Sequence, residues 1–246
     1  MESSFNAQAH SKSGAVGIWQ FTRRTGRHYL QIDAALDERL DPIRASEAAA
    51  DLLKTNYRRL ESWPLAITAY NHGISCMRRA KRRHKTYAAI FEDYRSRRFR
   101  FASRNFYPEF LAAREAAKNA HHYFDDLPPS VGRPTFQVAP DGFAPFKAVS
   151  THFKLDSRLL HHLNPALRPS VIRGLQDIPA GYPIRLPSHE WQYRLAYNAR
   201  IPHTLLNVRQ KPFPVYRVRK GDTISSIAKL HKLSVGDVVA ANNLSK

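Results

Sequence analysis

The sequence predicts an α+β protein, with a mainly helical region over residues 1–127 followed by two small units of β-α-α-β layout. Three observations predict this class. Apolar residues recur at helical spacing in the first half, strand-like alternation is confined to short stretches after residue 127, and helix breakers separate the two regions. At 246 residues the chain is long enough for one large core, or for one domain with one or two small modules.

The helical region is predicted from four stretches. In residues 43–60 apolar side chains recur every three or four positions, Pro64 suits the first turn of a second helix, and residues 106–119 are rich in Ala, Leu and Glu. The four predicted helices are Ile43–Leu60, Pro64–Asn71, Thr86–Arg95 and Phe106–Asn119.

The first small unit follows a stretch rich in breakers, which begins at Leu127–Ser130 and ends at Pro134. We assign this unit to residues 134–188. Its order is β, α, α, β, with a strand near Phe136–Val138, helices near Phe143–Phe153 and Ser157–Leu163, and a strand near Tyr182–Leu186.

The second small unit covers residues 215–246 and starts with the same order. Val215–Val218 alternates like a strand, and Gly221-Asp222-Thr223 forms a turn before helices at Ile224–His231 and Val235–Asn242. It stops before any closing strand. The shared layout suggests a divergent internal repeat, and residues 189–214 between the units are predicted to be a linker.

The net charge of the chain indicates a polyanionic partner but does not identify it. Lys and Arg outnumber Asp and Glu by 39 to 20, a net charge of +19 that attracts polyanions. Nucleic acid, anionic lipid and the carboxylate-bearing peptides of a bacterial wall would all respond to it. No apolar run reaches membrane-spanning length, no export signal is present, and Cys76, the only cysteine, can form no intramolecular disulfide.

Five short motifs stand in order near the N-terminus. They are E-S-x-F at Glu2–Phe5, G-A-x-G-x-W-Q-F at Gly14–Phe21, T-G-R at Thr25–Arg27, D-E-R at Asp37–Arg39 and A-Y-N-x-G at Ala69–Gly73. This set resembles family 1 lytic transglycosylases, especially the membrane-bound type D group, whose catalytic (SLT) domain is lysozyme-like. The resemblance implies a peptidoglycan-cleaving enzyme.

The resemblance implies that Glu2 is the catalytic acid. Cleaving a glycosidic bond requires a proton for the leaving oxygen, and a glutamic acid held partly out of water has a pKa raised enough to deliver it. In the family, the muramyl C6 hydroxyl attacks the anomeric carbon, so one carboxylate first donates and then accepts a proton. The bond expected to be cleaved joins N-acetylmuramic acid to N-acetylglucosamine, and the expected product is a 1,6-anhydromuramyl end.

The resemblance also assigns supporting residues. Ser3, Gln20, Tyr70 and Asn71 would line the cleft, orient Glu2 and hold the N-acetyl groups. We interpret Trp19 as a structural residue, because an aromatic beside a helical segment more often belongs to the core.

Two further segments contain candidate catalytic or cleft residues. Asp33, Asp37 and Glu38 are candidates for a second carboxylate, but D-E-R near Asp41 is better interpreted as local caps and an ion pair. Residues 101–113 resemble the family's E-T-R-x-Y-V-P segment and depart from it, with Ala102 in place of Glu and Phe106 in place of Tyr.

The second small unit resembles the LysM module, which binds N-acetylglucosamine backbones. The resemblance implies glycan contacts from Gly221, Asp222, Thr223 and Asn242, although Gly-Asp-Thr also makes a turn and an N-cap. Residues 134–188 resemble a degenerate LysM that lacks Gly-Asp-Thr. The sequence fits both a structural spacer that does not bind sugar and a working lectin module.

Other chemistry is not expected. The basic run Arg78–Lys85 is interpreted as a solvated face, and no groove-reading motif supports nucleic acid. The twelve histidines show no metal-binding spacing, so we predict no metal and no other cofactor.

The ends of the chain suggest a fragment. The lysozyme-like fold places the acid near the end of a helix that a chain starting at Met1 cannot contain, so we interpret the sequence as part of a longer exported protein. We expect the complete protein in the periplasm or outer membrane. The leading function is a lytic transglycosylase; the alternatives are a non-catalytic peptidoglycan-binding fragment and a hydrolytic muramidase.

Overall fold

The computed structural model describes residues 3–124, 132, 134–188, 200–212, 215–233, 235–242 and 244. These ranges form helices and one two-stranded sheet, which confirms the predicted α+β class. Two compact units are present: one joins Met1–Ser46 to Gly132–Lys246, and the other is Glu47–Val131. Among the described helices, none is both long and apolar enough to cross a membrane.

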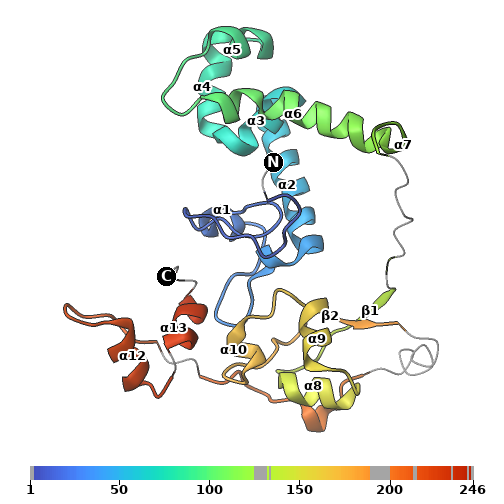
Figure 1. Cartoon of the computed structure of the whole chain (residues 1–246), viewed down its shortest axis with the longest axis vertical. Helices are drawn as coiled ribbons and strands as arrows, with labels where there is room; N and C mark the ends of the chain where they lie inside the picture. Colours follow the sequence, from blue (N-terminus) through green and yellow to red (C-terminus); the bar gives the residue numbers. More distant parts are fainter. Residues whose placement is uncertain are drawn as a thin grey trace. The chain divides into compact units, whose positions relative to one another are not determined.

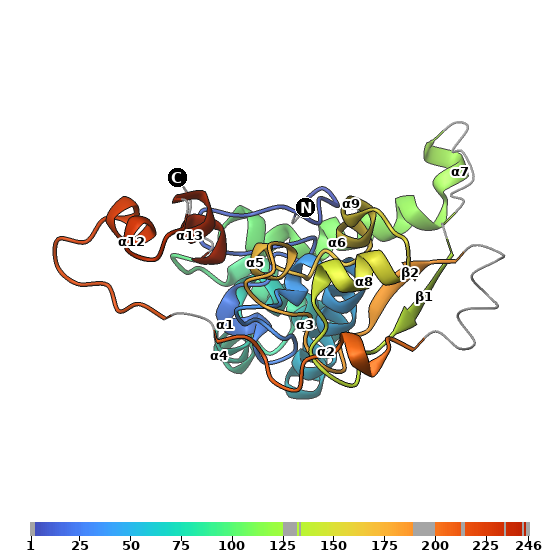
Figure 2. The same cartoon turned by 90° about the horizontal axis from the view of Figure 1, so that it is seen from below.

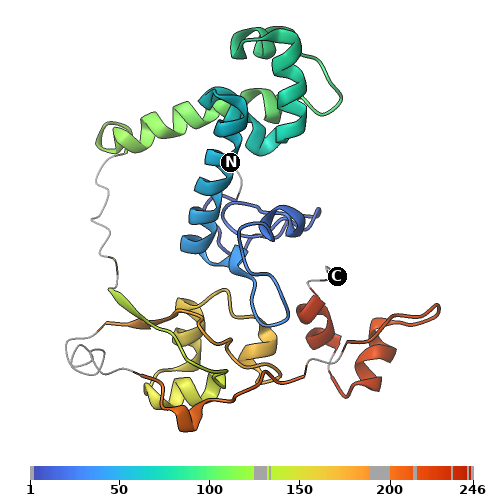
Figure 3. The same ribbon diagram turned by 180° about the vertical axis from the view of Figure 1, so that it is seen from behind.

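The unit 47–131 is helical, and its core lies between α3, α4, α5 and the turn before α6. Helix α3 packs against α4 and α6 (Figures 1 and 3), and Leu60, Leu65, Met77, Ile90 and Phe99 are buried together. The helices are α2 (Pro42–Leu60, which enters from the other unit), α3 (Trp63–His72), α4 (Ile74–His84), α5 (Tyr87–Asp93), α6 (Phe101–Lys118) and α7 (Ala120–Tyr123).

The four helices predicted in this region are confirmed as α2, α3, α5 and α6. Helix α6 begins at Phe101, five residues before the predicted Phe106, and Arg100 at its N-cap position makes no side-chain capping hydrogen bond. Helix α4 was not predicted. It places Met77 and Ala80 in the core. Most side chains of the basic run Arg78–Lys85 face solvent, as predicted.

In the other unit, residues 3–46 are mostly turns and short bridges, with α1 (Arg23–Gly26) and the 3-10 helix η1 (Glu38–Leu40). Isolated bridges join His10 to Val16 and Val16 to Phe21. Asp41 caps helix α2 by accepting hydrogen bonds from the backbone N–H groups of Ile43 and Arg44.

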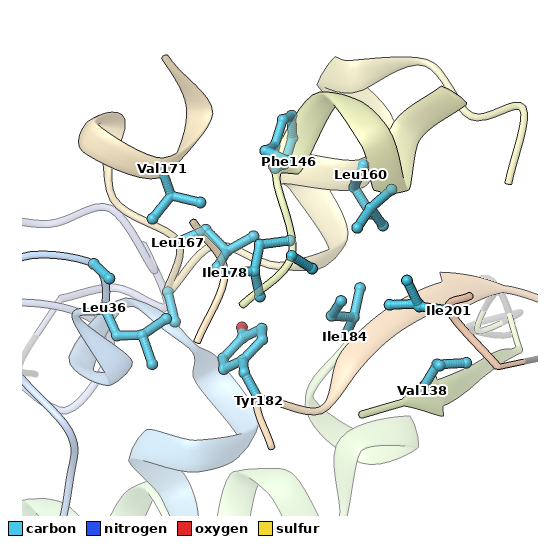
Figure 4. Packing of buried hydrophobic residues seen from close by; sticks show 14 of the residues in the cluster. Leu36, Val138, Phe146, Leu160, Leu167, Val171, Ile178, Tyr182, Ile184 and Ile201 are labelled. Atoms are coloured by element: carbon cyan, nitrogen blue, oxygen red, sulfur yellow. The ribbon is translucent and has the colours of Figure 1, made fainter. Parts of the chain in front are cut away.

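Residues 134–188 form a small module of β1 (Thr135–Val138), α8 (Phe146–His152), α9 (Ser157–Leu163), α10 (Pro169–Ile172) and β2 (Ile184–Pro187). The strands pair antiparallel with Val138 opposite Ile184, and α9 packs against β2 (Figure 1). Figure 4 shows Phe146, Leu160 and Ile184 in one apolar cluster. The predicted β-α-α-β order is present, with α10 as an addition.

Two neighbouring segments complete this module. Residues 200–212, assigned above to a linker, carry the 3-10 helix η2 (His203–Leu205) and bury Ile201 in the module's core. Residues 31–46 contribute Leu36 to the same core and the carboxylate of Asp41, which forms a buried, bidentate ion pair with Arg185. The module therefore supports the segment that carries the D-E-R motif.

Residues 215–242 contain α12 (Ile224–Leu230) and α13 (Val235–Asn242), which pack against each other. The predicted strand at Val215–Val218 is wrong: these residues form an irregular loop into α12 (Figure 2). A strand needs a partner for its backbone groups, and no described segment pairs with this one. Val215 is consequently 90% exposed and Val218 67%.

Candidate functional site

The predicted acid Glu2 lies outside the described residues. Its neighbour Ser3 is half-buried, and the Ser3 hydroxyl donates a hydrogen bond to the backbone carbonyl of Ile18 at 3.0 Å. Ser3 therefore ties the start of the described chain to the G-A-x-G-x-W-Q-F loop, residues 14–21.

The loop 14–21 is held in place by the D-E-R motif. Gly17 has φ +80°, and a Cβ there would collide with the carbonyl oxygen of Arg39, so the loop requires glycine at this position. The guanidinium of Arg39 donates hydrogen bonds of 3.1 Å to the carbonyls of Gly14 and Phe21. One buried side chain thus fixes both ends of the loop.

Arg39 is itself held by Asp37. The two side chains form a fork of hydrogen bonds at 2.7 and 2.8 Å, and their exposed fractions are 2% and 1%. Glu38 accepts from the backbone N–H of Gln31 and pairs with Arg44. The interpretation of this motif as caps and an ion pair is therefore confirmed, because both carboxylates are committed to the fold.

Within loop 14–21, Trp19 and Gln20 have different surroundings. The Trp19 indole N–H donates to the hydroxyl of Ser46 at 2.7 Å, which gives this side chain a structural role. Gln20 is half-buried with φ +48°, and its amide nitrogen donates to the carbonyls of Gly17 and Ala9. The side-chain nitrogen of Gln20 therefore closes the loop.

Tyr70 and Asn71 lie in the other compact unit, at the C-terminal end of α3. The helix ends at Gly73, whose φ of +90° favours glycine, and α4 follows directly. Tyr70 is half-buried and stacks on Phe106 of α6, with ring centroids 6.1 Å apart. The aromatic at position 106 therefore packs against the motif tyrosine.

Ser103 is a site residue that the sequence reasoning missed. It is 7% exposed, and its hydroxyl donates to the side-chain oxygen of Asn71 at 2.6 Å. This bond orients the exposed Asn71 amide, whose NH₂ group has no hydrogen-bond partner among the described residues. The available signal was the hydroxyl at position 103, where the similar family segment has threonine.

The four predicted LysM residues have local structural roles. Gly221 has φ +94° in the turn, and Thr223 caps α12 through a capping box with Ser226. A carboxylate oxygen of Asp222 accepts from the Tyr216 hydroxyl at 3.0 Å and from a backbone N–H, and the Tyr216 hydrogen bond raises the pKa of that phenol. Asn242, at the exposed end of α13, donates to the carbonyl of Val238.

The capping box predicts a measurable effect on α12. Replacing Thr223 by alanine should destabilise the helix by about 1 kcal/mol, because the backbone N–H of Ser226 loses its acceptor, the Thr223 hydroxyl. Hydrogen exchange of the Ile227 amide, which bonds to the Thr223 carbonyl, should accelerate about fivefold. Ser225→Ala, an exposed change in the same turn, is the control, and equal acceleration in both variants would contradict the cap.

Two regions of the chain match known protein families. Residues 1–90 match the family described as "Transglycosylase SLT domain", and residues 216–246 match "LysM domain". Two curated relatives, both named "Membrane-bound lytic murein transglycosylase D", come from Escherichia coli strains K12 and O6:H1. Each is 28% identical over 259 residues, covering 99% of this chain and 55% of the relative.

The resemblance to lytic murein transglycosylases is confirmed. The helical content and the small sheet agree with the lysozyme-like α+β fold predicted from the SLT motifs. The chain spans about half the length of these transglycosylases, at 55%. Among the described residues, no three His, Cys, Asp or Glu side chains gather closely enough to hold a metal ion.

Proposed function

We propose that the chain is a peptidoglycan lytic transglycosylase of the bacterial envelope. The observation that carries this proposal is the SLT match over residues 1–90, combined with similarity to lytic murein transglycosylases over 99% of the chain. The net charge of +19 supports it, because such a field attracts the carboxylates of wall peptides.

In the proposed reaction Glu2 acts twice. Its carboxyl proton passes to the glycosidic O4 as the C1–O4 bond between N-acetylmuramic acid and N-acetylglucosamine breaks. The C6 hydroxyl of the same muramyl residue then bonds to C1, and its proton returns to the Glu2 carboxylate. Because the nucleophile belongs to the substrate, no water is consumed and positioning of the sugar supplies much of the rate.

The supporting residues have separate tasks in this proposal. Ser3 holds the chain beside Glu2 through its bond to the Ile18 carbonyl. The Gln20 amide oxygen, the Tyr70 hydroxyl and the Asn71 NH₂ group contact the glycan. The positions of Asp37 and Glu38 support a mechanism with one carboxylate, since Asp37 is bonded to Arg39, and Glu38 to the Gln31 backbone and to Arg44.

The LysM region supplies wall affinity in this proposal. Gly221 and Asp222 form the turn, and Thr223 and Asn242 stand at the ends of α12 and α13. No described hydrogen bond reaches the second carboxylate oxygen of Asp222, and this atom would accept from a sugar hydroxyl. The degenerate module at 134–188 acts as a structural support, because it shares its core with Leu36.

Product chemistry tests the proposed activity. The chain is incubated with purified peptidoglycan, and released fragments are separated and identified by mass spectrometry before and after borohydride reduction. Anhydro ends, which borohydride does not reduce, are expected. Reducible ends would indicate a hydrolytic muramidase, and sedimentation with the wall without any release would indicate the non-catalytic binding protein.

Ser103 provides a finer test of the site. Ser103→Ala should lower the rate of anhydro product release about threefold to tenfold, because Asn71 loses the bond that orients its amide. Ser103→Thr keeps the hydroxyl and should retain most of the rate. Melting temperatures are measured in parallel, and equal rates in the two variants would show that Ser103 does not position Asn71.

A further inference from the structure

The helical unit 47–131 contains a pocket that none of the proposed catalytic residues lines. Its volume is about 590 Å³, and it lies between the ends of α3 and α4 and the segment that joins α5 to α6. Six basic side chains line it: His72, Arg79, Arg83, Arg95, Arg97 and Arg98.

Among the described residues, no acidic side chain lines this pocket. In the part of the chain that the structure describes, none of the five arginines forms an ion pair with a carboxylate, whereas Arg39, Arg44 and Arg185 of the other unit each do. Like charges held close together around a cavity repel one another, and this repulsion is relieved when an anion enters. The charge arrangement therefore favours a bound anion.

His72 adds a second, independent observation. It is 8% exposed, and its Nε2 atom is buried without a hydrogen-bond partner among the described residues. The rings of Phe99 and Tyr94 pack edge-on against the imidazole and fix its orientation. Burial, and then the charges of Arg98 and Arg79, lower the pKa of His72. An unpartnered buried nitrogen in a cationic pocket points to a missing ligand.

We propose that this pocket binds a phosphate-type oxyanion with at least two negative charges, such as a diphosphate or closely spaced phosphomonoesters. Guanidinium groups bond bidentately to both phosphate and carboxylate. A carboxylate offers only two oxygens, however, whereas a diphosphate offers enough to engage several of the five guanidinium groups together. The negative charge of the bound anion also favours the protonated imidazole of His72, whose Nε2–H can donate to it. The inference is independent of glycan cleavage, because it concerns a different set of residues.

Isothermal titration calorimetry with inorganic pyrophosphate tests the pocket in the full chain. Succinate, a dicarboxylate, is titrated at the same near-physiological ionic strength. Pyrophosphate should bind at least about tenfold more tightly than succinate, because more guanidinium groups engage it. Equal affinities would overturn the assignment to phosphate.

A matched pair of double variants separates the pocket from the general positive field. The double variant Arg79→Gln with Arg98→Gln should weaken pyrophosphate binding about tenfold or more. The control, Arg58→Gln with Arg59→Gln, removes the same charge from exposed positions of α2 outside the pocket, and it should change the pyrophosphate affinity less than about twofold. An equal loss in both double variants would overturn the proposal. If the first variant fails to fold, Arg83→Gln, at an exposed lining residue, replaces it with an expected loss of about threefold.

Vesicle binding then distinguishes the source of the phosphate. Vesicles displaying a phosphomonoester lipid are compared with vesicles of equal surface charge made with a phosphodiester lipid. Selective binding that depends on Arg79 and Arg98 supports a lipid headgroup as the natural ligand. Pyrophosphate binding without selective vesicle binding supports a soluble phosphate in the same pocket.

Discussion

Replacing Glu2 by glutamine is expected to lower the release of anhydromuropeptides by about a thousandfold, the size typical for losing a general acid–base group. The amide has nearly the shape of the carboxyl group, but it neither delivers a proton to O4 nor accepts one from the C6 hydroxyl. The rate is measured on purified peptidoglycan. Sedimentation with the wall should be unchanged, since the LysM region is untouched.

The control for Glu2 is Asp33→Asn, the same change of a carboxylate to an amide. Asp33 is exposed, and one of its oxygens accepts from the backbone N–H groups of Ala35 and Leu36, which an asparagine oxygen can also do. Its rate should therefore stay within about twofold of the parent. A comparable collapse in Asp33→Asn would show that a second carboxylate takes part, and it would contradict the one-carboxylate mechanism.

Replacing Arg39 by methionine is expected to lower the free energy of unfolding by about 3–5 kcal/mol, the cost of removing one partner of a buried ion pair. Asp37 loses its bidentate partner, and the carbonyls of Gly14 and Phe21 lose theirs. Loop 14–21 should then open, so that proteases cut between Gly14 and Phe21 much faster than in the parent.

The matched control for Arg39 is Lys54→Met, which breaks an ion pair with Asp51 in which both side chains are 63% exposed. Exposed pairs contribute little, so the free energy of unfolding should change by less than about 1 kcal/mol. Chemical denaturation with fluorescence detection measures both variants. A similarly small effect in both would mean that Arg39 does not hold the loop.

Most helices could be predicted from the sequence because their signals are local. Helices α9 and α13 have the predicted bounds, and α2 begins at Pro42, one residue before the predicted Ile43 and directly after the capping Asp41. Helix α4 could not be predicted from apolar spacing, because most of its residues are basic and only two of them are buried. Lysine and arginine are good helix formers, and Met77 and Ala80 mark its buried face.

The tertiary contacts could not be predicted, because no local pattern encodes them. Arg185 pairs with Asp41 across 144 positions, and Arg168 donates to the Asp33 carbonyl across 135. The strand expected at Val215–Val218 failed for the related reason that alternation alone supplies no pairing partner. Such features depend on which segments meet in three dimensions.

The sequence predicted which motif residues belong to the candidate site, but it predicted only some of the contacts that those residues make. The D-E-R motif was correctly interpreted as an ion pair, but its hold on the carbonyls of loop 14–21 was visible only in the structure. Ser103 was missed because its partner, Asn71, lies 32 positions away on another helix. The role of Glu2 stays a prediction.

Digestion of peptidoglycan in water enriched in oxygen-18 tests the central claim most directly. The account predicts that every new muramyl end is an anhydro end without the heavy isotope, because the C6 hydroxyl of the substrate replaces water. A hydrolytic muramidase run in parallel should label its products with one heavy oxygen atom. Incorporation of that atom into the ends produced by this chain would contradict the account.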